Sequence, residues 1–266
     1  MSRFRILTWG PDAMPAVVCL HGVGGHARRF ERLARMLDDA RRVIAYDLRG
    51  HGRSPWSGPQ SLDQHVADLD EVMEAAGIET AAMIGHGLGA LIGLRAAARQ
   101  PERVSALVLL DPPLFTPGGV LRDQARAARK DVAYVTLDEA IECHLAEGGL
   151  RHTPRALLEE EMAEHLVAGE DGRFRPRYSR EAAAAALEGL AGEPPPALED
   201  VACPTLLLRG GESELVRDED VADATAQLPH CTAQVVPGGH MLLWDALAET
   251  GALVRQFLLV PQRSNA

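Results

Sequence analysis

The stretch "AAMIGHGLGALIGLRAAARQPERVSALVLLDPPL", residues 81–114, decides the fold of this chain. Its first apolar run predicts a buried strand, and the glycines at 85, 87 and 89 predict a sharp turn. The pattern over 88–100 then predicts a helix, and the apolar run at 106–112 predicts a second strand. A strand, a helix and a strand in this order form a parallel pair with a crossover helix.

The same alternation extends to both sides of this stretch. Further strands are predicted at 16–22, 42–50, 204–211 and 233–240, in addition to those at 81–87 and 106–112. Helices are predicted at 27–39, 61–76, 88–100, 218–227 and 245–258. Short, continuously apolar strands alternating with helices indicate an α/β protein with a parallel, doubly wound sheet that is buried on both faces. Such sheets bind their ligands at the carboxyl ends of the strands.

One segment, residues 114–196, interrupts this alternation. It contains no convincing strand but four amphipathic patterns that predict helices at about 118–131, 136–149, 154–168 and 179–190. We therefore expect an all-helical cap, or lid, inserted into a core domain made of 1–113 and 197–266. The proline-containing run at 192–204 predicts a stiff return to the core, and the tail at 260–266 is expected to fray.

Composition limits the possible partners of the protein. The chain has 266 residues, 46% of them apolar, and a formal net charge of −11. A strongly acidic chain argues against nucleic acid as a partner, so a small-molecule substrate is expected. No signal peptide or membrane span is visible, which predicts a cytoplasmic protein with no membrane partner. The four cysteines lack metal or disulfide spacing, and no histidine and carboxylate cluster has ligand spacing at the predicted site, so neither a metal nor a cofactor is expected.

Five short motifs stand at the ends of the predicted strands. They are His21-Gly22 in "LHGVGGH", "DLRGHGRS" at 47–54, the turn at 85–89, Asp111, and Gly239-His240. Each motif alone is weak evidence for a family. Taken together and in this order, the five motifs resemble those of the α/β-hydrolase superfamily, of the capped esterase, lactonase and thioesterase kind. The resemblance covers nearly the whole chain. In that family the turn is the nucleophile elbow, G-x-S-x-G. Here Gly87 stands where the family has serine.

The resemblance assigns roles to several residues. The backbone N–H groups of Val23 and Leu88 correspond to an oxyanion hole, in which aimed donors stabilise developing negative charge. The resemblance also places Gly22, Gly24 and His86 beside the substrate. The general base of the family corresponds to His240, and Gly87 occupies the nucleophile position.

The acidic partner of His240 has two candidate positions. Many relatives carry an aspartate after the seventh strand, where this chain has Ser213 between Glu212 and Glu214. Other relatives carry the acid at the end of the sixth strand, about two dozen residues after the nucleophile, and Asp111 stands 24 residues after Gly87. Asp111 is therefore favoured over the two glutamates, with Ser213 helping to orient His240.

Glycine at position 87 excludes an acyl-enzyme mechanism, because it has no side-chain nucleophile. Three interpretations follow. The chain is a hydrolase whose serine has been replaced; or it is a cofactor-free lyase, isomerase, cyclase or oxygenase-like enzyme that uses His240 as a general base; or it is a non-catalytic binder of a small ligand. The retained histidine, aspartate and oxyanion loop favour the first two.

Overall fold

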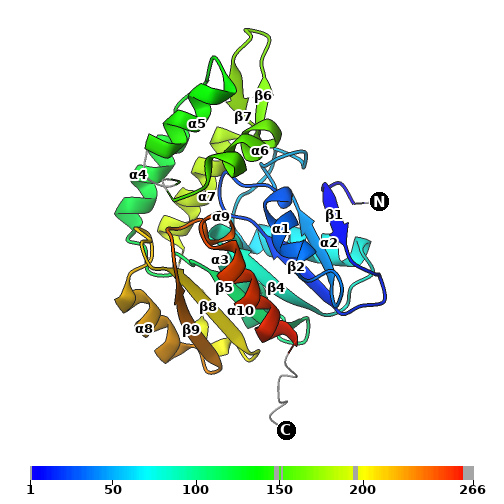
Figure 1. Ribbon diagram of the computed structural model, residues 1–266. Coiled ribbons are helices and arrows are strands. Elements are labelled where there is room, and N and C mark those ends of the chain that lie inside the picture. The colour runs from blue at the N-terminus through cyan, green and yellow to red at the C-terminus, as the bar shows by residue number, and fades with distance from the viewer. Residues whose placement is uncertain (1, 147–149, 151, 194–196, 260–266) are drawn as a thin grey trace.

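A computed structural model describes residues 2–146, 150, 152–193 and 197–259. Its centre is a seven-stranded sheet with the order β1-β3-β2-β4-β5-β8-β9 (Figure 1). The strands are β1 (Ile6–Trp9), β2 (Ala16–Leu20), β3 (Arg42–Tyr46), β4 (Ala81–His86), β5 (Val104–Leu110), β8 (Thr205–Gly210) and β9 (Cys231–Val236). All neighbouring pairs are parallel except β1 with β3. The predicted parallel strands are confirmed, and the antiparallel edge strand β1 was not predicted.

The sheet carries a separate hydrophobic core on each face. Alternate residues of β2 divide between them, so that Val18 and Leu20 pack into one core and Val17 and Cys19 into the other. Side chains alternate between the two faces of a strand, and a strand buried on both faces must therefore be apolar throughout. This explains why the predicted strands are continuous apolar runs rather than alternating ones.

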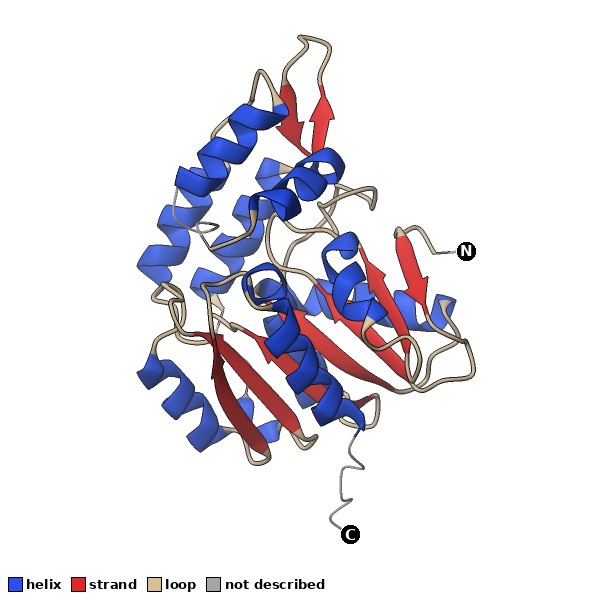
Figure 2. Ribbon diagram, in the orientation of Figure 1, coloured by secondary structure: helices blue, strands red, loops and turns tan. Residues whose placement is uncertain are grey.

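Helices cover both faces (Figure 2). One core contains side chains of α2 (Leu62–Ala75), α3 (Leu88–Arg99), the 3-10 helix η2 (Leu198–Asp200) and α8 (Asp218–Gln227). The other contains side chains of the 3-10 helix η1 (Ala27–Phe30), α1 (Glu31–Arg35), α9 (Leu242–Asp245) and α10 (Leu247–Leu259). The helix predicted at 27–39 is thus divided into two shorter ones, whereas the helix predicted at 245–258 corresponds to α10 and is preceded by the short α9. No helix in the described parts of the chain is long and apolar enough to span a membrane.

Residues 114–193, which come between β5 and β8 in the chain, lie in their described parts beyond the carboxyl ends of the parallel strands (Figure 1). We call this segment the insertion. It contains α4 (Gly118–Ala128), α5 (Leu137–Ala146), α6 (Arg155–His165), β6 (Leu166–Ala168), β7 (Phe174–Pro176) and α7 (Arg180–Gly192).

The expectation of an all-helical insertion was wrong, because β6 and β7 form an antiparallel hairpin. The helix predicted over 154–168 ends at His165, and the following turn contains Gly169 and Gly172, the second with a φ of +74°. Glycine adopts this left-handed conformation readily, and the turn reverses the chain. Strands of three residues are too short to produce a recognisable alternating pattern. The prolines at 194–196 and the tail at 260–266 lie outside the described residues.

Candidate active site

The turn between β4 and α3 has the strained backbone of an elbow. Gly87 has a φ of +54° and a ψ of −117°, and Leu88 begins α3. The glycine at 89 is required by close packing, because a Cβ there would collide with the carbonyl oxygen of Leu20 on β2. The sequence thus brings a helix directly against the sheet and leaves residue 87 at the tip of the turn, in a conformation that glycine tolerates best.

His240, Asp111 and Ser213 form a connected chain of hydrogen bonds. Asp111 Oδ2 lies 2.7 Å from Nδ1 of His240 and accepts a 2.6 Å hydrogen bond from the Ser213 hydroxyl. The other carboxylate oxygen accepts the backbone N–H of Gly210 at 3.0 Å. Asp111 is fully buried and is the one non-glycine residue with a positive φ, +45°, in the described part of the chain. The expected contact between Asp111 and His240 is therefore present.

This arrangement fixes the orientation of the imidazole. A carboxylate can only accept, so Nδ1 of His240 carries the proton and Nε2 presents its lone pair. A methyl carbon on residue 87 would lie 3.5 Å from that Nε2 and 3.6 Å from the Cα of Gly22. Residue 87 thus lies between the imidazole and the loop after β2, with space for a side chain or a water molecule.

His86 supports the base through its backbone. Its Nε2 donates to the carbonyl oxygen of His240 at 3.0 Å, and the two rings lie 4.3 Å apart between centroids. Burial is the largest cause that lowers the pKa of His86, and the neighbouring His240 lowers this pKa further. The ring of His86 therefore stays neutral. A neutral His86 positions the loop that carries His240 and adds no charge to the site.

A cavity of about 300 Å³ opens over the elbow. Residues of the core and of the insertion line it: Gly22, Val23, Arg29, His86, Gly87, Leu88, Pro113, Thr116, Leu121, Gln124, Leu187, Leu190, Leu215, His240 and Met241. Most of these side chains are apolar. Leu88, as the first residue of α3, has a backbone N–H without an acceptor inside the helix, which leaves this donor free for a ligand.

The predicted site residues divide into three groups. Gly22, Val23, His86, Gly87, Leu88 and His240 line the cavity, whereas Asp111 and Ser213 lie behind His240. Gly24 is not among the lining residues, because its N–H is directed away and donates to Nε2 of His51 at 3.0 Å. Ser213 acts on His240 only through Asp111, while Glu212 lies 3.3 Å from His152 of the insertion.

Three polar residues of the cavity were not predicted from the sequence. Among the described lining residues, Arg29 on η1 is the one with a permanent charge, and Gln124 comes from α4. The hydroxyl oxygen of Thr116 is buried and has no hydrogen-bond partner among the described residues. Nothing in an arginine-rich sequence distinguishes Arg29, and the other two residues reach the cavity only because the insertion folds back over the sheet.

Comparison with known proteins agrees with this geometry. The family described as "alpha/beta hydrolase fold" matches residues 15–247 of the chain. The chain belongs to this family. Its sequence is 32% identical to 2-(acetamidomethylene)succinate hydrolase of Mesorhizobium japonicum over 229 residues, which cover 84% of this chain and 80% of that protein.

Two further similarities extend over most of the α/β-hydrolase fold. A putative 2-succinyl-6-hydroxy-2,4-cyclohexadiene-1-carboxylate synthase of Bacillus subtilis is 29% identical over 272 residues, covering 96% of this chain and 94% of that protein. The crystal structure of E-2-(acetamidomethylene)succinate hydrolase superposes with a TM-score of 0.85 at 25% identity, covering 96% of this chain and 94% of the other. The family therefore includes relatives named for hydrolysis and one named for a synthase reaction.

Proposed function

We propose that this protein is a cofactor-free enzyme related to carboxylic ester, lactone and thioester hydrolases, with Gly87 in place of the nucleophilic serine. The observation that carries the proposal is the intact base: His240 is bound to Asp111 through Nδ1, and its Nε2 faces residue 87. A site that had lost all chemistry would have no need for this arrangement.

In the proposed reaction, water takes the place of the missing serine. His240 removes a proton from a water molecule in the space over Gly87, and the water oxygen bonds to the substrate carbonyl carbon. The carbonyl electrons move to its oxygen, where the N–H groups of Val23 and Leu88 stabilise the negative charge. Collapse of this intermediate breaks the bond to the alcohol or thiol, which takes the proton from His240.

The substrate is proposed to be a small acyl compound with an apolar part. Leucines at 121, 187 and 190 line the cavity from the insertion, and its volume of about 300 Å³ limits the size of the ligand. The insertion is proposed to act as a lid that excludes bulk water from the carbonyl group. Exclusion of water strengthens the electrostatic effect of the two N–H donors.

A second candidate is a lyase, isomerase, cyclase or oxygenase-like reaction without hydrolysis. The same His240 would remove a proton from a carbon next to a carbonyl group, and the same donors would hold the enolate oxygen. The full-length similarity to a protein named as a synthase favours keeping this candidate. A non-catalytic ligand binder is the third possibility, because Gly87 offers no nucleophile.

The proposal is tested with activated esters, thioesters and lactones of increasing acyl length. We expect slow turnover without a burst, no labelling by a fluorophosphonate, and a loss of about 10² to 10⁴ in kcat/KM in His240→Ala. His230→Ala, an exposed histidine, serves as the control. Hydrogen exchange into the substrate without hydrolysis would support the second candidate. Binding without either reaction, or an equal rate in His240→Ala, would reject catalysis by this base.

A further inference from the structure

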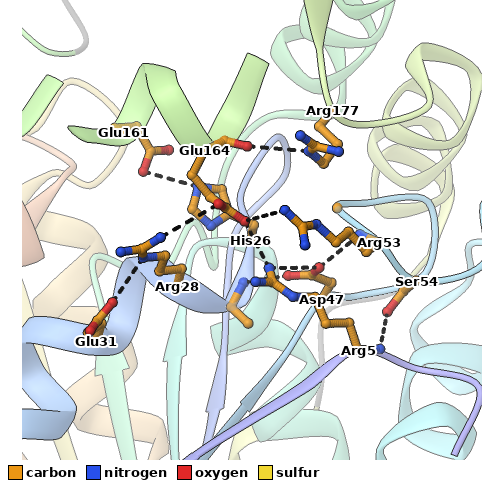
Figure 3. Close-up of polar contacts among 12 residues, drawn as sticks. Arg5, His26, Arg28, Glu31, Asp47, Arg53, Ser54, Glu161, Glu164 and Arg177 are labelled. Atoms are coloured by element: carbon orange, nitrogen blue, oxygen red, sulfur yellow. Dashed lines mark hydrogen bonds and ion pairs between the residues drawn. The ribbon is translucent and has the colours of Figure 1, made fainter. Parts of the chain in front are cut away.

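A group of three buried side chains lies where the insertion contacts the core. His26 precedes η1, and Glu161 and His165 stand on α6. Their exposed fractions are 4%, 7% and 5%, and one ligand atom from each lies within 4.8 Å of the others. Residues four positions apart share one face of a helix, so Glu161 and His165 both approach His26. Figure 3 shows Glu161 directed from α6 toward His26.

One imidazole nitrogen of this group lacks a partner among the described residues, while another is paired with Glu161. Nδ1 of His26 is buried and has no hydrogen bond with any residue that the structure describes. The ring of His165 stacks on that of His26 at 5.8 Å between centroids. Buried polar atoms are nearly always bonded, so the unpaired Nδ1 marks this cluster as unusual.

The spacing suits a small cation with nitrogen and oxygen ligands. Bonds of 2.0–2.2 Å in a tetrahedral zinc site place neighbouring ligand atoms about 3.3 Å apart. Nε2 of His26 and Oε2 of Glu161 are 3.1 Å apart, close to this value. The other ligand atoms of the group lie at most 4.8 Å from one another. Their separations therefore need to shorten by at most about 1.5 Å to reach the spacing of a zinc site.

Arg29 holds the carboxylate in a suitable orientation. Its Nε donates to Oε1 of Glu161 at 2.7 Å and leaves Oε2 facing His26, while its guanidinium lies 4.9 Å from the ring centroid of Trp244. Carboxylates that bind a metal are commonly hydrogen-bonded through their other oxygen. The positive charge of Arg29 disfavours any cation, so a metal must gain its affinity from the imidazoles. Imidazole ligands suit zinc and its neighbours, whereas magnesium and calcium prefer sites made of oxygen atoms.

We propose that His26, Glu161 and His165 form a binding site for zinc or a similar divalent transition metal, which ties the insertion to the core. None of the three lines the cavity over the elbow, but Arg29 lines that cavity and contacts Glu161, so the proposed metal site adjoins the candidate active site. A second pocket of about 260 Å³, lined by His26 and Glu161, gives access to it and leaves room for a water molecule as the fourth ligand.

The test measures zinc binding by the full chain after treatment with a chelator. Equilibrium dialysis against buffered Zn²⁺, with metal analysis, should find one zinc per chain for the parent and for His230→Ala. His165→Phe, which keeps the ring volume, should weaken binding at least tenfold, and an excess of Mg²⁺ should not compete. Zinc should also raise the melting temperature of the parent but not that of His165→Phe.

X-ray absorption at the zinc edge of the parent should reveal two imidazole ligands, and this measurement needs no variant. The proposal is overturned if the parent binds no zinc, if His165→Phe binds it as tightly as the parent, or if the spectrum lacks imidazole scattering. Activity is not a readout in any of these experiments, so their outcome is independent of the proposed function.

Discussion

Restoring a hydroxyl to the elbow tests whether the rest of the site is still arranged for a nucleophile. In Gly87→Ser, the new Cβ would lie 3.5 Å from Nε2 of His240, an ordinary van der Waals contact, so the side chain fits without displacing its neighbours. The hydroxyl attached to this carbon would come within hydrogen-bonding reach of a base that Asp111 already orients.

The cost of this substitution comes from the backbone. Gly87 has a φ of +54° and a ψ of −117°, and a non-glycine residue held in such a conformation costs about 1–3 kcal/mol. For a domain of this size each kcal/mol lowers the melting temperature by about 2–4 °C, so a decrease of about 2–12 °C is expected. Gly87→Ala should show the same decrease, because it has the same backbone strain and no hydroxyl.

The assay is labelling by a fluorophosphonate together with the burst of product from an activated ester. Gly87→Ser should incorporate one label per chain and show a burst, and neither the parent nor Gly87→Ala should do so. A folded Gly87→Ser protein that remains unlabelled would refute the reasoning, since the base or the oxyanion donors would then be out of place. Gain of esterase activity with loss of a parental reaction would identify glycine as the functional residue.

Two further predictions concern stability and the substrate. Burial lowers the pKa of His65 to about 4, and its ring nitrogens have no partner among the described residues. As the pH decreases, His65 therefore takes up a proton in the unfolded chain before it does so in the folded protein. The free energy of unfolding decreases between about pH 6.5 and pH 4, by up to about 3 kcal/mol. His65→Leu should raise the melting temperature at pH 7 and flatten this dependence in thermal melts, and unchanged slopes would contradict the explanation. Leu187→Trp, which fills part of the cavity, should shift kcat/KM toward shorter acyl groups in a chain-length series; a uniform change would show that this wall does not contact the acyl group.

Much of the core was predictable because its signals are local. Continuous apolar runs identified six of the sheet's strands, and the spacing of Asp111 from Gly87 favoured the carboxylate that contacts His240. Strand β1 was missed because it has only four residues and Thr8 interrupts its apolar run. The hairpin of β6 and β7 was missed because three residues do not define a period.

Features that depend on docking of the insertion were not predictable. Glu161 is 135 residues from His26 and 132 from Arg29, and these side chains meet only after α6 has packed against the core. The spacing of Glu161 and His165 shows that they share a helix face but does not reveal what they face. Gly24 was assigned to the substrate from its place in a motif, whereas its backbone N–H binds His51, a contact that the motif does not encode.

The place of the insertion between β5 and β8 affects how the protein folds during synthesis. Leu107 to Leu110 of β5 pair with residues 205–208 of β8, nearly 100 residues later in the chain. A ribosome adding about 5–20 residues per second needs roughly 5–20 seconds to supply the missing strand. Throughout this interval one edge of an apolar strand is open to association with other chains. Asp111 and His240 can meet only after β9 has also been added, so the site cannot form while the nascent chain is incomplete.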